Sequence, residues 1–128
     1  MILVDSSVWI DHLRGTDALL ADLLHRRQVL THPFVIGELA LGNLRQRSTI
    51  IDAMLDLPKA TAANDSEVLA FIERQAIHGR GIGYIDVHLL AAVRLSAGAK
   101  LWTRDKRLNG TAIELGLAAT FPPPQVSN

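Results

Sequence analysis

The sequence predicts an α/β fold, a three-layer α/β/α sandwich with a mostly parallel central sheet. Short apolar segments such as residues 1–4 alternate with longer stretches of helical periodicity, a pattern typical of parallel strands joined by helical crossovers. These short segments are apolar almost throughout rather than at alternate positions, as expected where helices cover both faces of a sheet. Residues 1–121 contain no repeat and no linker, so we expect a single domain there, followed by a polar, Pro-rich tail at 122–128.

The first half of the chain contains two strand candidates and four helical stretches. In order, we expect a strand at 1–4, helices at 8–13 and 16–27, a strand at 28–32, and helices at 33–44 and 47–57. Ser6 or Ser7 is the expected N-cap of the first helix. Pro33 suits the first position of the third helix because its fixed φ angle matches a helix start. Pro58 ends the fourth helix.

The second half alternates short strands with helices. We expect, in order, a short strand at 59–63, a helix at 65–79, a loop at 79–84, a helix at 85–98, a strand at 99–103, a helix at 105–116 and a last short strand at 117–121. Asn64 or Asp65 is the expected N-cap of the first of these helices, with Glu67 in its first turn. Gly98 and Gly116 suit the ends of the two later helices.

Composition excludes several classes of protein. The chain has 128 residues, of which 48% are hydrophobic, and it contains no cysteine, so we expect a globular domain without disulfides or thiolate metal ligands. No apolar run approaches the roughly 18 residues that a membrane-spanning helix needs, and we expect a cytoplasmic protein without a membrane partner. Thirteen Lys and Arg residues balance thirteen Asp and Glu residues. This balance argues against a protein that coats nucleic acid, but not against an enzyme that contacts a few phosphates.

Four acidic residues occupy notable positions: two follow predicted strands, and two lie on the apolar stripes of predicted helices. Asp5 and Asp105 follow strand candidates directly or almost directly, and ligands of open α/β sheets bind outside the carboxyl ends of the strands. Asp86 heads the apolar stripe of its helix, and Glu38 lies in mid-helix on another apolar stripe. An acid at such a position is costly to bury unless something pairs with it. All four can therefore lie at one edge of the sheet.

Each acid also has a structural alternative. Asp5 and Asp105 can cap the helices that follow them, Asp86 can interact with a helix dipole, and Glu38 can pair with a buried arginine. The combination favours a site, because two carboxylates at 4 Å repel by about 4 kcal/mol at an effective dielectric of 20. A cluster of four either takes up protons or binds cations, and oxygen ligands suit Mg²⁺ or Mn²⁺ rather than zinc.

Three other functional classes fit the sequence less well. A HAD-like phosphatase with Asp5 as nucleophile needs a second acid two residues later, where this chain has Ser7. A receiver domain needs paired acids at the end of the first strand, where Asp5 stands alone. The chain has no G-x-x-x-x-G-K-[ST] motif, which excludes a P-loop nucleotide enzyme.

Four segments of the chain match one protein family in order. They are MILVDSSVWID at 1–11, HPFVIGELALGNL at 32–44, GRGIGYIDVHLLAA at 79–92 and KLWTRDKRL at 100–108. Together they resemble the PIN-domain family, and most closely the VapC-type toxins of bacterial toxin–antitoxin pairs. The resemblance spans nearly the whole chain. Ser6, where many relatives have Thr, is a conservative difference.

The resemblance implies a PIN-like α/β/α sandwich and an endoribonuclease that needs Mg²⁺ or Mn²⁺. By position, the family's catalytic and metal-binding acids correspond to Asp5, Glu38, Asp86 and Asp105. Ser7 matches a small polar residue that orders the first acid, and Thr103 matches the hydroxyl two residues before the last. The implied partners are RNA, a small antitoxin whose C-terminal segment wraps the toxin, and a second copy of the chain in a homodimer.

Three basic residues flank the last acid. Arg104, Lys106 and Arg107 can contact phosphates of the RNA backbone, or they can be ordinary solvated charges at a helix start, where the dipole disfavours them. Attack by water would leave 5′-phosphate and 3′-hydroxyl ends, and attack by the RNA 2′-hydroxyl would form a cyclic phosphate. The alternative function is a PIN-like module that binds RNA or protein without cutting it, and the complete set of acids argues against it.

Overall fold

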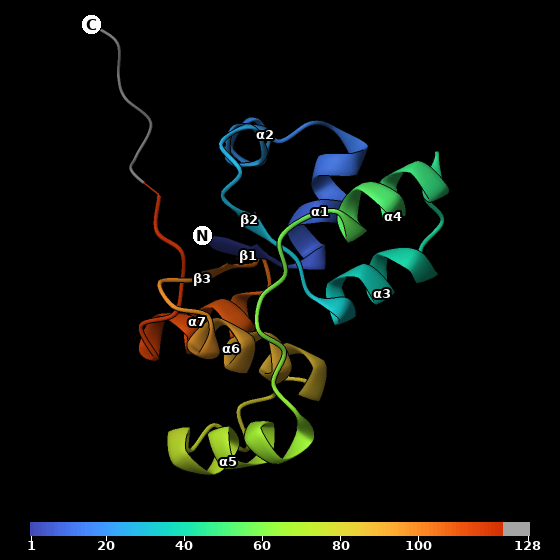
Figure 1. The fold of residues 1–128 in the computed structure, drawn as a ribbon. Helices are drawn as coiled ribbons and strands as arrows, with labels where there is room; N and C mark the ends of the chain where they lie inside the picture. The colour runs from blue at the N-terminus through green and yellow to red at the C-terminus, as the bar shows by residue number, and fades with distance from the viewer. Residues whose placement is uncertain (122–128) are drawn as a thin grey trace, which may run out of the picture.

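The computed structural model describes residues 1–121, which fold into seven helices around a three-stranded sheet (Figure 1). In chain order, the elements are β1 (Ile2–Val4), α1 (Ser6–Arg14), α2 (Ala18–His25), β2 (Val29–Leu30), α3 (Pro33–Leu41), α4 (Arg47–Leu55), α5 (Asp65–Gln75), α6 (Tyr84–Leu95), β3 (Lys100–Trp102) and α7 (Lys106–Glu114). The alternation of strands and helices confirms the predicted α/β class.

The sheet is parallel, with strand order β2-β1-β3. Leu3 in the central strand pairs with Leu30 on one side and Leu101 on the other. Figure 1 shows α1 and α2 on one side of the sheet and α6 and α7 on the other, so helices cover both faces. Because β1 and β3 are parallel neighbours, the residues that follow them emerge at the same edge. This edge carries the candidate site.

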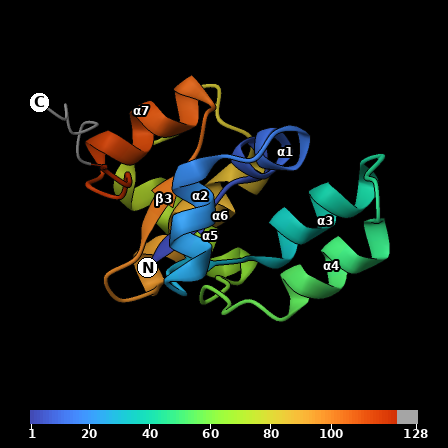
Figure 2. The same ribbon diagram turned by 90° about the horizontal axis from the view of Figure 1, so that it is seen from above.

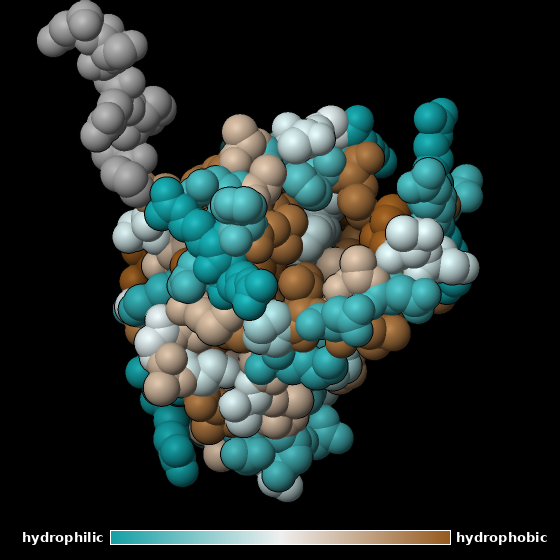
Figure 3. Space-filling model, turned by 45° about the horizontal axis from the view of Figure 1, so that its top comes forward, coloured by the Kyte–Doolittle hydropathy of each residue, from teal (hydrophilic) through white to brown (hydrophobic). Residues whose placement is uncertain are grey.

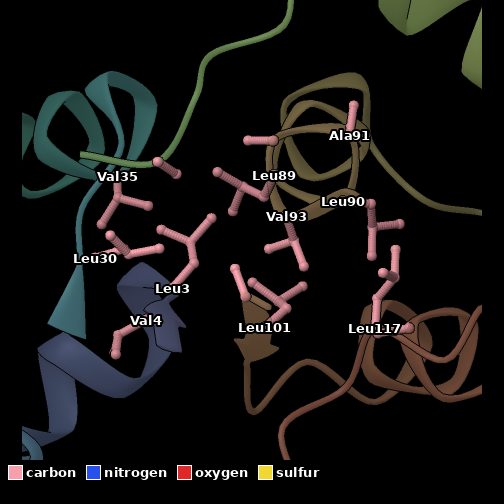
Figure 4. Packing of buried hydrophobic residues seen from close by; sticks show 14 of the residues in the cluster. Leu3, Val4, Leu30, Val35, Leu89, Leu90, Ala91, Val93, Leu101 and Leu117 are labelled. Atoms are coloured by element: carbon pink, nitrogen blue, oxygen red, sulfur yellow. The ribbon is translucent and has the colours of Figure 1, made fainter. Parts of the chain in front are cut away.

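The core lies between the sheet and its helices. Leu3, Leu89 and Leu101 are fully buried. Figure 4 shows Leu89 and Val93 of α6 facing the strands, with Val93 above Leu101, while Leu90 lies beside Leu117. Several buried positions of α6 are consecutive, from Val87 to Val93, which shows that this helix lies in the interior with neighbours on more than one side. The rigid placement of α6 matters because its first turn carries one of the predicted acids.

Two helices stand apart from the sandwich. α3 and α4 form a helical hairpin that projects to one side in Figure 2, and α3 also packs against α1.

α5 forms an outer layer against α6. Its N-terminus has a capping box, in which Asn64 accepts from the backbone N–H of Glu67 and the Glu67 side chain accepts from that of Asn64. The expected Asn64 cap is confirmed.

Several local expectations are wrong. Asp5, not Ser6 or Ser7, is the N-cap of α1, because its carboxylate accepts from the backbone N–H of Ser6. The segments 59–63 and 117–121 each make only one isolated bridge, since short Ala-rich segments at the sheet margins bury too little to extend the ladder. α5 ends at Gln75 rather than Gly79, because Ala76 adopts a left-handed conformation with φ +50°.

The predicted tail at 122–128 lies outside the described residues, and a domain boundary at residue 121 stays a prediction. Across residues 1–121, none of the helices combines the length and the apolar character needed to cross a membrane.

Candidate active site

Asp5 is the most firmly held of the predicted acids. It directly follows β1, and its backbone N–H donates to the carbonyl oxygen of Trp102 in β3 at 2.9 Å. The residue is only 5% exposed. Oδ1 accepts from the backbone N–H of Ser6 at 2.8 Å, and Oδ2 accepts from Ser7 Oγ at 2.9 Å and Thr103 Oγ1 at 2.7 Å. Three donors therefore fix the carboxylate and offset the cost of burying its charge.

The turn after β3 brings the second acid to the same edge. Thr103 Oγ1 donates to Asp5 and accepts from the backbone N–H of Asp105 at 3.1 Å. Ser7 Oγ accepts from the backbone N–H of Arg104 at 3.0 Å. Asp105 is exposed and caps α7, with Oδ1 accepting from the backbone N–H of Leu108 at 3.0 Å. The hydroxyls of Ser7 and Thr103 thus join the ends of β1 and β3, and their site-ordering role stays a prediction.

The surroundings of Asp86 raise its pKa. It lies half-buried in the first turn of α6. Burial, and after it the charges of Asp5, Asp105 and Glu38 in that order, together raise its pKa to about 6. A carboxylate responds in this way to negative charges that lie nearby. The three other predicted acids therefore lie near enough to Asp86 for their charges to act on it.

Glu38 differs from its expected environment. The residue is exposed, and its Oε2 accepts from Ser6 Oγ at 3.1 Å. The expectation that it faces an apolar interior is wrong, because α3 belongs to the projecting hairpin and Leu41 on the same helix is 90% exposed. Ser6 Oγ also lies 3.4 Å from Asp5 Oδ1. This hydroxyl links α3 to the acid at the end of β1.

The side chains of the four acids are not arranged as a metal-binding site. Within residues 1–121, no group of three or more His, Cys, Asp or Glu side chains is arranged to hold a metal ion as it stands. Like charges without a counterion keep apart, and Asp5 and Asp105 use oxygens in hydrogen bonds to the protein. The donor set nevertheless fits a hard divalent cation, since every candidate ligand is a carboxylate oxygen. A bound cation would counteract both the burial and the neighbouring negative charges that raise the pKa of Asp86.

The three basic residues near Asp105 have different surroundings. Arg104 forms ion pairs with Asp11 of α1 and with Asp17, the N-cap of α2, the latter at 2.6 Å. These carboxylates raise the pKa of Arg104. Lys106 and Arg107 are exposed, and neither has a carboxylate partner in the described part of the chain. The structure therefore gives Arg104 a role in joining β3 to α1 and α2.

Two features of the site escaped sequence reasoning. The Ser6 hydroxyl bridges Asp5 and Glu38, although the sequence suggested only a helix cap there. Asp11 and Asp17 hold Arg104, and no local pattern links these acids to a residue 87 or more positions away. The double serine after Asp5 was the one available signal, since two adjacent hydroxyls at a strand end exceed what a single N-cap needs.

Comparisons with known proteins agree with this architecture. The sequence profile of the PIN-domain family matches residues 2–114 of the chain. The chain is 48% identical over 118 residues to Ribonuclease VapC32 of Mycobacterium tuberculosis, in strains CDC 1551 and H37Rv alike. That match covers 92% of this chain and 95% of each relative.

Proposed function

The chain belongs to the PIN-domain family, and from this premise we propose that it is an endoribonuclease, the toxin of a VapBC-type toxin–antitoxin pair, acting with Mg²⁺ or Mn²⁺. Its relatives of similar length are named as VapC ribonucleases. The observation that carries the metal-dependent part is the pKa of Asp86, raised to about 6 by burial and by three neighbouring carboxylates. Such a cluster is useful for a reaction that gathers positive charge and a phosphodiester. RNA as substrate makes the cytoplasm the proposed compartment.

The residues of the site divide the work of hydrolysis. Asp5 is held in one orientation by Ser7 and Thr103, which suits a carboxylate that must keep its geometry during the reaction. Asp105 and Asp86 supply further oxygens from the start of α7 and α6. Glu38 is exposed beside Ser6 and can accept a proton from a nucleophile as general base.

A divalent cation is the cofactor that this donor set fits. When bound, Mg²⁺ or Mn²⁺ would acidify a water molecule and offset negative charge on the phosphate. Asp5, Asp86, Asp105 and Glu38 are the residues that would hold it. Binding would also offset the burial and the repulsion that together raise the pKa of Asp86, so Asp86 would be more fully ionised at neutral pH in the loaded protein.

The substrate phosphates have two basic contacts. Lys106 and Arg107 are exposed at the start of α7, next to Asp105. We assign them to the RNA backbone, as phosphate contacts that orient the strand without reading its sequence. Arg104 contributes less to this binding, because its guanidinium already pairs with Asp11 and Asp17.

Cleavage of total cellular RNA by the purified protein tests the proposal. We expect discrete fragments with Mg²⁺ or Mn²⁺, none with EDTA, and none from Asp5→Asn. Asparagine keeps the N-cap, but its amide nitrogen cannot accept from Ser7 and Thr103. Thermal unfolding of the variant therefore accompanies the assay to separate chemistry from folding, and Asp52→Asn on α4 is the matched control. Analysis of the fragment ends distinguishes water from the 2′-hydroxyl as nucleophile. Equal cleavage by Asp5→Asn would instead favour a PIN-like binding module.

We assign the antitoxin to a groove beside α1. A cavity of about 530 Å³ lies between α1 and the α3–α4 hairpin, where Figure 3 shows apolar side chains inside a hollow. Ile10, Leu13 and Ile50 line it, with Arg14 and Arg45. An apolar segment with acidic residues suits this lining. Ile10→Asp should prevent neutralisation by the antitoxin while cleavage persists. Ile113→Asp, at an exposed position of α7, should leave neutralisation intact.

The homodimer expected from the family is part of the proposal. Light scattering of the purified wild-type chain tests it directly, and a monomeric mass would refute it. The result leaves the assignment of the acids untouched, because every residue of the proposed catalytic set lies within one chain.

A further inference from the structure

A small cavity lies between the end of α5 and the start of α6. Its volume is about 240 Å³. Its apolar lining includes Ile72, Ile77, Ile82 and Val87, and Tyr84 forms part of its wall. Sites for drug-sized ligands usually have roughly 300–1,000 Å³. The smaller cavity therefore suits a single planar ring system.

The loop that lines the cavity contacts α7, the helix that Asp105 caps. Tyr84 and Asp86 share the first turn of α6, although side chains two residues apart on a helix point to different faces. Gly81 also lines the cavity. A Cβ atom on Gly81 would lie 2.6 Å from Nη1 of Arg107, so the guanidinium rests against this loop. Arg107 itself stands two residues after Asp105 on α7.

Tyr84 is fixed and yet accessible. Its hydroxyl donates to Asp65 Oδ1 at 2.9 Å. Its ring meets His88 edge-on, with centroids 4.7 Å apart. The residue is still 43% exposed. An aromatic ring held in place beside an apolar cavity is a ready surface for stacking a nucleic-acid base.

We propose that this cavity binds the base of one nucleotide beside the scissile phosphate, with Tyr84 as the stacking surface and Arg107 at the adjoining phosphate. The inference rests on the proposed ribonuclease function and adds a specificity-determining residue to it. The apolar lining favours a base over a sugar or a phosphate. The cation beside the cavity complements the negative backbone that a nucleotide brings.

The loop at the cavity can add hydrogen bonds to the base. Among the hydrogen bonds of residues 1–121, none is donated by the backbone N–H groups of Gly81 or Gly83, which are both exposed. Gly81 has φ +74°, a conformation that glycine adopts without strain. An ion pair between Arg80 and Glu114 ties the loop to α7. The Gly81 donor is therefore held on a tethered loop that lines the cavity, and the Gly83 donor lies two residues further along the chain.

Fluorescent oligoribonucleotides test the proposal without requiring cleavage. The probes are short RNAs that carry one 2-aminopurine or one pyrrolocytosine, moved through the sequence one position at a time. They are bound to the Asp5→Asn protein in the presence of Mg²⁺. We expect quenching at one position, because stacking on Tyr84 quenches such bases. Adding Tyr84→Ala should abolish this quenching and weaken binding about tenfold, the effect of losing one base–aromatic stack.

Two further variants separate stacking from structure. Tyr84→Phe should keep the quenching, since it keeps the ring and loses only the bond to Asp65. Ile72→Phe narrows the cavity from α5 and should weaken binding at the same position. Leu69→Phe, on the exposed face of that helix, is its matched control. Thermal unfolding checks that each variant folds.

The outcomes distinguish the two proposals. A wild-type protein that cleaves RNA, with no position-specific quenching by either probe, refutes the base site alone. The same refutation follows if Tyr84→Ala keeps the quenching or if Tyr84→Phe loses it. A wild-type protein that cleaves no RNA refutes the ribonuclease assignment, whatever the probes report.

Discussion

The two halves of the proposed active site are built differently. Asp5, Ser7 and Thr103 form a network at the ends of β1 and β3, in which Asp5 and Thr103 are buried and every oxygen of the Asp5 carboxylate accepts a hydrogen bond. By contrast, Asp86 is half-buried and Glu38 is exposed. Both lie among other negative charges. Folding alone supplies the hydrogen-bond donors that the Asp5 carboxylate needs. It leaves the negative charges around Asp86 and Glu38 uncompensated.

We therefore expect the Asp5 network to stabilise the fold and the surroundings of Asp86 to destabilise it. Hydrogen bonds to a charged group contribute about 1.5–3 kcal/mol each, so the Asp5 network stabilises the fold while it orders the site. The burial of Asp86 and the repulsion around it act against folding, and a cation that binds the folded protein offsets both. A functional site commonly retains such a local conflict.

The largest effect should come from Asp86→Asn. We expect cleavage to fall about a thousandfold, because several kcal/mol of cation-dependent stabilisation are lost. The metal-free protein should nevertheless become more stable by about 1 kcal/mol, a value reduced for the partial exposure of the side chain. Cleavage assays and urea unfolding at pH 7.5 measure the two changes.

The pH dependence gives this prediction a definite sign. The folded-state pKa of Asp86 is about 6, above the ordinary value of 3.8, so the folded protein binds more protons than the unfolded chain between these values. Stability should therefore fall as pH rises through this window, and Asp86→Asn should remove that slope. Asp52→Asn on α4 is the control. A destabilised Asp86→Asn protein, or an unchanged slope, would contradict the comparison.

Cation binding should give the next largest effect. At a concentration of Mn²⁺ one hundred times its dissociation constant, a ligand of the folded state alone stabilises by about 2.7 kcal/mol. We expect the wild-type melting temperature to rise with Mn²⁺ at pH 7.5. The rise should be smaller at pH 5, where Asp86 is protonated, and nearly absent in Asp86→Asn. An equal rise in wild type and variant would place the cation elsewhere.

Thr103→Val addresses the ordered half. The substitution leaves Oδ2 of Asp5 without one of its donors and the backbone N–H of Asp105 without its acceptor. We expect a loss of about 1–3 kcal/mol in unfolding free energy and a 10–100-fold loss of activity, as is typical for partners of metal ligands (roughly 1.4–2.8 kcal/mol in activation free energy). Both changes have the same sign, unlike those of Asp86→Asn.

Two substitutions check the interpretation of Thr103. Thr103→Ser keeps the hydroxyl and should recover most of the activity. Thr111→Val removes another buried threonine hydroxyl, on α7, and should leave the cleavage rate close to wild type. If Thr103→Val lost stability but kept full activity, the hydroxyl would serve the fold alone.

The sequence predicted the strand ends better than the surroundings of the acids. The apolar runs before Asp5 and Asp105 led to neighbouring parallel strands, because a fully buried strand has a distinct local pattern. The structural alternatives also proved correct for these two acids, since each caps the helix that follows. Capping and site formation do not exclude each other here. One carboxylate oxygen serves the helix while the residue stays at the edge of the sheet.

The contacts that escaped prediction are long-range. Helical periodicity put Glu38 on an apolar stripe, but it could not show that α3 belongs to a projecting hairpin. The flanking charges of Asp105 favoured phosphate contacts, but local sequence could not show that Arg104 reaches Asp11 and Asp17. Pairings of this kind depend on tertiary packing, which local propensity does not determine.

The smallest effects should separate Arg104 from Arg107. Arg104→Ala removes ion pairs with Asp11 and Asp17, and we expect a loss of about 1 kcal/mol, or about 4 °C in melting temperature. Arg107→Ala should leave the melting temperature unchanged, raise KM for RNA several-fold, and reduce the salt dependence of RNA binding by about one charge. Steady-state kinetics across a salt series, beside thermal unfolding, measure both. The two arginines would exchange roles if Arg104→Ala changed the salt dependence without changing stability. The assignment of Arg107 to the substrate, and with it the phosphate contact beside the Tyr84 cavity, would then have to be abandoned.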